Sequence, residues 1–124
     1  MQMAEPRLLL IGKLQSTLDV LAEELRRFGR DVVATNDRAL IGQTLTEGKA
    51  DLVVIGGGLD EPARAEMRDY VLGISPEIPL YLAPRGEGTS PATALTFANE
   101  QIVLYKVLAA AGRDRSEGQR DPDR

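Results

Sequence analysis

A continuous apolar run that ends in three glycines is the feature that most constrains the fold of this chain. The run is Asp51-Leu52-Val53-Val54-Ile55, and Gly56-Gly57-Gly58 follows it. A short run of this kind is typical of a strand buried on both faces of a parallel sheet. In open α/β sheets, functional groups lie just beyond the carboxyl ends of such strands. Here glycine occupies that position, so the side chain that would carry out chemistry there is missing.

The rest of the chain alternates between strand-like and helix-like segments. Strands are predicted over residues 7–12, 31–35, 51–55 and 80–83. Apolar residues recur at the spacing of one helix face after the first strand: Leu14, Leu18, Leu21, Leu25 and Phe28. Similar but shorter patterns follow the second and third strands. This order predicts a parallel sheet with helices on both faces and right-handed connections.

Capping residues and glycines mark where these helices begin and end. Ser16 is a predicted N-cap of the first helix, and Gly29 is its predicted end. Asn36-Asp37 is predicted to open the second helix. Asp60 or Glu61 before Pro62 is predicted to open the third, because proline suits the first helical turn.

The segment after Pro84 has two self-consistent interpretations. In one, residues 92–97 form a fifth strand and a last helix runs from residue 99 or 100 to 111. In the other, Ser90 caps and Pro91 begins one long helix to Ala111. We favour the strand, because residues 80–83 would otherwise form an exposed edge. We expect one domain over residues 1–112 and a charged, disordered tail over residues 113–124.

Composition excludes several classes of chemistry. The 124 residues include no cysteine and no histidine, which excludes disulfides, thiolate catalysis, the usual structural zinc sites and histidine acid–base catalysis. The net charge is −4, with acids and bases interspersed, so neither nucleic acid nor an anionic membrane is an expected partner. We predict no catalytic residue, metal or cofactor, no secretory signal or membrane span, and a cytoplasmic location.

Four segments resemble the receiver domain of bacterial two-component response regulators. They are Leu8-Leu9-Leu10-Ile11, Asp51-Leu52-Val53-Val54-Ile55, Pro76-Glu77-Ile78-Pro79-Leu80 and Phe97-Ala98-Asn99-Glu100. The resemblance extends over residues 7–111. It implies a flavodoxin-like three-layer α/β/α sandwich with a parallel sheet of order 2-1-3-4-5, in which the fourth helix is shortened or missing.

The functional residues of that family do not carry over to this chain. Gly12-Lys13 stands where the family has its magnesium-binding acidic pair, and Gly56 stands where it has its phosphate-accepting aspartate. Pro84 replaces the switch serine or threonine, and Leu95-Thr96 replaces a Lys-Pro pair. The resemblance therefore implies a degenerate pseudo-receiver, a non-enzymatic module of bacterial signalling that acts through protein–protein contact.

A second function remains open at the carboxyl edge of the predicted sheet. Glycine amides and two cations could bind a nucleotide or another phosphate there; the candidate residues are Gly12, Lys13, Gly56, Gly57, Gly58 and Arg85. We favour the simpler interpretation that these glycines shape tight turns, because no complete phosphate-binding motif is present. Carboxylates at Asp60, Glu61, Glu66 and Asp69 are interpreted as a charged helix surface and not as a metal site.

The last helix is apolar on more than one face, which is more than a helix covering one side of a sheet needs. We predict that it contacts a partner protein or a second copy of the chain. The candidate interface residues are Ile102, Val103, Tyr105, Lys106 and Ala109. Deeper burial of this helix within the domain explains the excess equally well.

Overall fold

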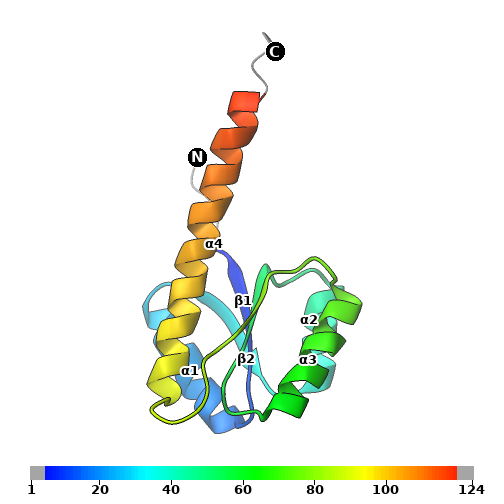
Figure 1. The fold of residues 1–124 in the computed structure, drawn as a ribbon, viewed down its shortest axis with the longest axis vertical. Coiled ribbons are helices and arrows are strands. Elements are labelled where there is room, and N and C mark those ends of the chain that lie inside the picture. The colour runs from blue at the N-terminus through cyan, green and yellow to red at the C-terminus, as the bar shows by residue number, and fades with distance from the viewer. Residues whose placement is uncertain (1–4, 120–124) are drawn as a thin grey trace.

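A parallel sheet of four strands forms the centre of the part of the chain that the structure describes, and helices cover both of its faces (Figure 1). The computed structural model describes residues 5–119, with side chains through residue 112. The elements are β1 (Arg7–Ile11), α1 (Gln15–Arg27), β2 (Asp31–Thr35), α2 (Arg38–Thr46), β3 (Leu52–Ile55), α3 (Glu61–Ile74), β4 (Leu80–Leu82) and α4 (Pro91–Gln119). The strand order is β2-β1-β3-β4.

The two central strands supply the core of both layers. Alternate residues of a strand point to opposite faces, so Leu8 and Leu10 of β1 pack toward α1 and α4. Leu9 and Ile11 pack toward α2 and α3. All residues of β3 are buried as well. Burial of each such side chain stabilises the fold by about 1.5–3 kcal/mol, which makes these two strands the main source of stability.

The prediction of a fifth strand over residues 92–97 is wrong, because these residues form the first turns of α4. The sheet therefore has the order 2-1-3-4 and not 2-1-3-4-5. The Ser90 carbonyl oxygen accepts hydrogen bonds from the Thr93 and Ala94 amides, and the Thr93 hydroxyl oxygen accepts one from the Ser90 amide. The Thr93 side chain thus takes the part of the third helical residue of a capping box, and Pro91 suits the first helical turn. The single long helix, which was the other interpretation of this segment, is the one observed.

Most of the predicted helix ends are confirmed. Asp37 accepts a hydrogen bond from the Ala39 amide at 3.0 Å and caps α2. Asp60 accepts one from the Ala63 amide at 2.9 Å and caps α3. Gly29 follows α1 with a φ of 81°, a left-handed conformation that favours glycine.

The first helix begins two residues earlier than a Ser16 cap would allow. Leu14 is the N-cap of α1, and its side chain accepts no hydrogen bond from the helix. The inner face of α1 is Leu18, Leu21, Ala22 and Leu25. Leu14 and Phe28, which were predicted on that face, are 58% and 61% exposed. Leu14 and Phe28 thus mark the two ends of α1, outside the core.

The last helix is long and extends beyond the sheet, away from the rest of the fold (Figure 1). It continues to Gln119, so residues 113–119, which were predicted to begin a tail, are helical, and residues 120–124 lie outside the described residues. Among the described residues, none of the helices combines the length and the apolar character that crossing a membrane requires.

An ion pair between Arg7 and Asp51 links two strands at the amino edge of the sheet. Arg7 Nε donates to Asp51 Oδ2 at 3.1 Å, and the Arg7 amide donates to the same oxygen at 2.8 Å. Asp51 lies just before β3 and so links β1 to β3. The hydrogen bond from Arg7 holds the pKa of Asp51 below its ordinary value of 3.8, although partial burial opposes the shift.

This ion pair predicts an acid-dependent loss of stability. Because the folded-state pKa of Asp51 is lowered, its contribution is complete above the unfolded-state value of 3.8 and is lost as the pH falls through the folded-state pKa. The Asp51→Asn variant is therefore expected to unfold more easily than wild type at pH 7. The difference should shrink in strong acid, and it should be modest because the Arg7 side chain is 43% exposed.

Urea unfolding of both proteins at neutral and strongly acidic pH measures the difference directly. Asp69→Asn, at an exposed position, is the control and should show no such pH-dependent difference from wild type. An Asp51→Asn effect of equal size at both pH values would contradict this role of the Arg7–Asp51 pair.

Candidate functional site

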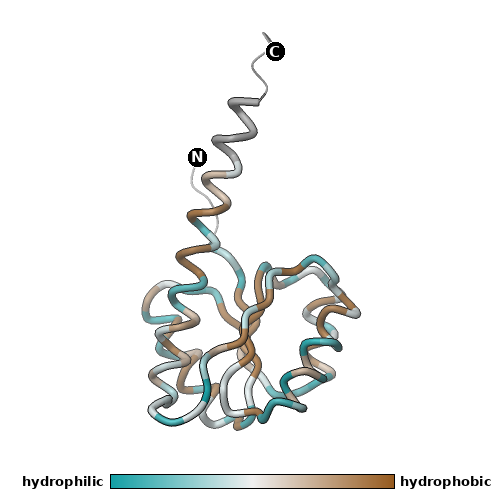
Figure 2. The backbone as a smooth tube through the Cα atoms, viewed as in Figure 1, coloured by the Kyte–Doolittle hydropathy of each residue, from teal (hydrophilic) through white to brown (hydrophobic). Residues whose placement is uncertain are grey.

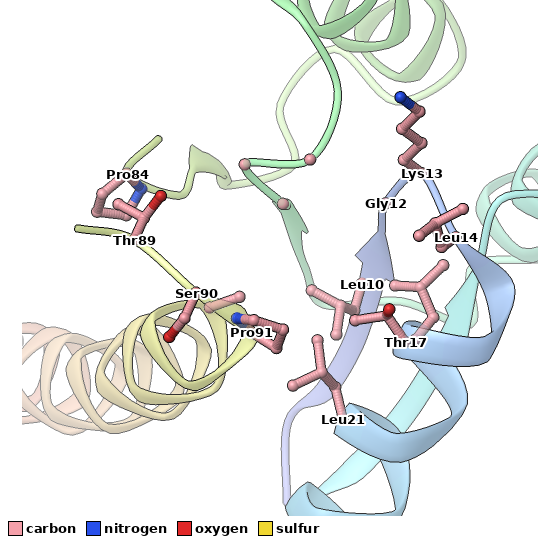
Figure 3. Close-up of a pocket in the computed structure, with 15 residues that line it drawn as sticks. Leu10, Gly12, Lys13, Leu14, Thr17, Leu21, Pro84, Thr89, Ser90 and Pro91 are labelled. Atoms are coloured by element: carbon pink, nitrogen blue, oxygen red, sulfur yellow. The ribbon is translucent and has the colours of Figure 1, made fainter. Parts of the chain in front are cut away.

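A pocket of about 340 Å³ opens at the carboxyl edge of the sheet, between the first turns of α1 and α4 (Figure 3). The ends of β1 and β3, the loop after β4 and both helix starts contribute to it. Its lining residues are Leu10, Gly12, Lys13, Leu14, Thr17, Leu18, Leu21, Gly56, Gly57, Gly58, Pro84, Thr89, Ser90, Pro91 and Ala94. The parallel arrangement brings these segments together, because the carboxyl ends of all the strands meet at one edge.

The floor of the pocket is apolar. Leu10 of β1 and Leu18 and Leu21 of α1 are almost fully buried and form it. Leu10 and Leu21 lie beside each other at the base of the pocket in Figure 3. Pro91 and Ala94, in the first turn of α4, close the opposite side. A ligand in this pocket would therefore rest on hydrocarbon.

The structure brings together five of the six candidate binding residues, and their role in binding stays a prediction. Gly12, Lys13 and Gly56-Gly57-Gly58 line the pocket. Arg85 is not part of the lining. Its Nε donates to the Gly57 carbonyl oxygen at 3.2 Å, so it braces the loop after β4 against the loop after β3.

Gly57 has a packing reason to be glycine. A Cβ at this position would lie 2.5 Å from the Pro84 carbonyl oxygen and 3.1 Å from the Arg85 Cβ. A backbone oxygen cannot give way cheaply, so the two loops can approach each other only if residue 57 lacks a side chain. The tight-turn interpretation thus accounts for Gly57 without any ligand. A Cβ on Gly58 would meet only Lys13 Cβ, at an ordinary 3.5 Å.

Polar groups surround the apolar floor. Lys13 is exposed, is the only charged residue of the lining and makes no ion pair with any described residue. Figure 3 shows its side chain extending away from Leu10 and Leu21, toward the rim. The hydroxyl groups of the lining belong to Thr17, Thr89 and Ser90.

The α4 half of the pocket was missed in the sequence. Thr89, Ser90, Pro91 and Ala94 belong to the pocket only because α4 begins beside the ends of β1 and β3. The Ser90-Pro91 pair indicated a helix start there, but the strand interpretation of residues 92–97 placed this segment elsewhere.

The polar side chains of the lining are one lysine and three hydroxyl residues. The lining contains no carboxylate, and the described residues contain no cluster of acidic side chains that could hold a metal ion. Asp37 and Asp60, which follow β2 and β3, are occupied as helix caps. Glu66 pairs with Arg38 on the surface of the helices, as expected for a solvated face.

Four of the five predicted interface residues lie on the face of α4 that packs against the domain, and the fifth, Val103, lies outside it. Ile102 is fully buried in the core, and Tyr105 packs against it. Lys106 Nζ forms an ion pair with Glu5 Oε1 at 3.1 Å. Ala109 is half-buried, at a hollow near Glu5 on the amino edge of the sheet. Of the five, only Val103 is a large apolar side chain left exposed.

The exposed apolar surface of α4 is a stripe of Val103, Leu104, Val107 and Leu108, which we call the α4 stripe. These side chains are 43–57% exposed. Their spacing places them on one side of the helix, at the turns where α4 leaves the sheet (Figure 2). Three of the four were absent from the predicted interface.

Comparisons with known proteins do not place the chain in a family. No family model matches it, and no curated protein does either. A solved structure of the yeast Spc42 trimeric coiled coil, amino acids 181–211, fused to another structure is similar with 14% identity. The match covers 91% of this chain and 89% of that chain, with a TM-score of 0.49. A likeness at this level does not bear on the function of the chain.

The close contact at Gly57 predicts that the stability of the fold depends on residue 57 having no side chain. Gly57→Ala is expected to lower the free energy of unfolding by about 1–3 kcal/mol, because the added Cβ must displace the Pro84 backbone. Gly58→Ala is the matched control and should change stability by less than about 1 kcal/mol. Urea unfolding measures both values. If the two variants were equally stable, close packing of the two loops would not be what requires glycine at residue 57.

Proposed function

We propose that this chain is a non-catalytic, receiver-like interaction module that associates with a second copy of itself through the α4 stripe. The observation that carries the proposal is the row of exposed apolar side chains on a helix that extends beyond the sheet. The four-stranded parallel sheet is compatible with the flavodoxin-like architecture of receiver domains. In this interpretation the chain acts in bacterial signalling or regulation through protein contact.

The free energy for such contact comes from apolar area that the fold leaves in water. Each side chain of the α4 stripe is about half exposed, so covering it would gain on the order of 1 kcal/mol. The four side chains form an apolar row on one side of the helix, with the exposed Glu100 one turn before it. A helix that projects from its domain also gains little stability from propensity alone and depends on packing. Association through the α4 stripe would cover the apolar area and pack the projecting helix.

A second copy is the occupant that the stripe fits best. The other side of α4 is already engaged, through Ile102 in the core and Lys106 with Glu5. The stripe itself is uniformly apolar and carries no charged or hydrogen-bonding group that would require a complementary partner. Two identical apolar faces related by a two-fold axis satisfy each other, as in most homodimers.

The carboxyl edge supports the non-catalytic part of the proposal. Aspartyl phosphorylation needs a carboxylate nucleophile and carboxylates that hold a metal beside it. Gly56 and Gly12-Lys13 occupy those positions of the receiver pattern, and Lys13 brings a cation where the metal would be needed. Leu95 and Thr96, which align with the family's Lys-Pro pair, lie within α4 and not at the end of a strand.

Placing a charge in the α4 stripe should prevent association. Wild-type protein is expected to form a dimer whose population rises with concentration, measured by sedimentation velocity. Val107→Lys should weaken dimerisation by at least about tenfold, because a buried unpaired ammonium is costly. Thr46→Lys, at an exposed position of α2, adds the same charge away from α4; it is the control and should dimerise normally. A wild type that stays monomeric, or a control that fails like Val107→Lys, would overturn the proposal.

Treatment with a phosphodonor tests the other half of the proposal. With acetyl phosphate and magnesium, intact-protein mass spectrometry is expected to find no added phosphoryl group, because no carboxylate lies at the position of Gly56. A typical receiver domain in the same reaction is the positive control. Formation of an aspartyl-phosphate at any residue of this chain would refute the absence of phosphorylation.

A further inference from the structure

The pocket at the carboxyl edge is not explained by an interaction through the α4 stripe. No strand follows β4, so residues 84–90 cross directly to the start of α4, and the pocket lies between this crossing and the ends of β1 and β3. Its volume of about 340 Å³ lies at the lower end of the range for ligand pockets, roughly 300–1,000 Å³. At roughly 30 Å³ per water-sized group, it holds about ten non-hydrogen atoms.

The lining indicates that the main part of a ligand is apolar. Three leucines form the floor, and Pro84, Pro91 and Ala94 add hydrocarbon on the α4 side. Water in such a space finds few hydrogen-bond partners, so displacing it costs little. An apolar group of the size of one ring or a short chain would fit the volume.

Leu14 provides a separate indication at the rim of the same pocket. It is the N-cap of α1, a position where serine, threonine, aspartate or asparagine stabilises a helix by about 1 kcal/mol relative to an apolar residue. The leucine makes no cap hydrogen bond and is 58% exposed. It thus stabilises neither the helix nor the core, and it extends the apolar surface of the pocket. Local costs of this kind are typical of functional sites.

The charge of the lining indicates the sign of the charge on the polar end of a ligand. Lys13 is the only charged residue, and no carboxylate is present to accept a cationic group. A cationic ligand would be repelled by Lys13, whereas an anionic head group would be attracted to it. The lysine lies at the rim and the leucines at the floor (Figure 3), so a ligand with an anionic head and an apolar body matches the order of the lining.

We propose that this pocket binds a small molecule with an apolar body, one ring or a short chain in size, and a single anionic head group, a carboxylate or a phosphate. The apolar body rests on Leu10 and Leu21, and the head lies beside Lys13 and the glycines at residues 56–58. The pocket uses the first turn of α4 and the α4 stripe uses residues 103–108, so ligand binding and dimerisation can be lost separately.

Three probes with the same ring and different head groups test this directly on the full chain. Phenylacetate carries a carboxylate, phenyl phosphate a phosphate and phenethylamine an ammonium. Titrations followed by amide chemical shifts should show saturable changes at Gly12, Gly56 and Gly58 with one or both anions. The anion that binds more tightly identifies the head group, and phenethylamine should bind at least about tenfold more weakly.

Variants connect the binding to the pocket. Ala94→Leu fills the α4 side and should abolish the shifts, whereas Ala92→Leu, exposed in the same turn, is the matched control and should keep them. Thr17→Leu fills the pocket from α1 and gives a second test if Ala94→Leu fails to fold. Lys13→Gln should reduce the preference for the anions over phenethylamine while preserving the fold.

The following outcomes would overturn part or all of the proposal. If no probe shifts these amides saturably, or if binding survives both filling variants, the pocket is not the site. If phenethylamine binds as tightly as the anions, or if Lys13→Gln leaves their preference unchanged, the anionic head group is refuted. The same samples in sedimentation velocity report the oligomeric state independently.

Discussion

The start of α4 at Ser90-Pro91 is the constraint on which the rest of the structure depends. The Thr93 hydroxyl oxygen accepts a hydrogen bond from the Ser90 amide at this start. The helix then carries Ala94, Ala98 and Ile102 at spacings of four residues into one core cluster. Splitting this segment into a strand and a shorter helix would break that continuous apolar row. Because the row is kept, the chain has no fifth strand, β4 becomes an edge with Leu82 39% exposed, and the pocket remains open beside it.

A buried arginine stabilises the end of β4 at a cost. Arg64 of α3 is almost fully buried, and its Nη2 donates to the Ala83 carbonyl oxygen at 2.7 Å. Its Nε has no partner, and its guanidinium no carboxylate, among the described residues. A buried charge without a carboxylate partner is expensive, since its desolvation is not offset by an ion pair. The contact nevertheless satisfies a carbonyl oxygen at the end of β4, next to the loop that Arg85 braces against Gly57.

The strands and most helix ends could be predicted from the sequence because their signals are local. Runs such as Leu52–Ile55 and caps such as Asp37 and Asp60 act within a few residues. The fork after Pro84 could not be resolved in this way, since residues 92–97 satisfy strand and helix patterns alike and tertiary packing decides between them. The exposed face of α4 was predicted wrongly for a related reason. Ile102 and Leu104 are equally apolar, and only the position of the sheet decides which of the two is buried. Arg64 gave no signal, because arginine is usually exposed.

The site was predictable to the extent that strand ends define it. Residues 12–13 and 56–58 meet because parallel strands end at one edge. The α4 side of the pocket depends on whether residues 92–97 form a strand or a helix. The three glycines also differ in kind. Residue 57 cannot carry a side chain beside the Pro84 carbonyl oxygen, but residue 58 has room for one next to Lys13. Close packing therefore requires glycine at residue 57 and not at residue 58, where the neighbour is Lys13, a cation without an ion-pair partner among the described residues at the rim of an apolar pocket.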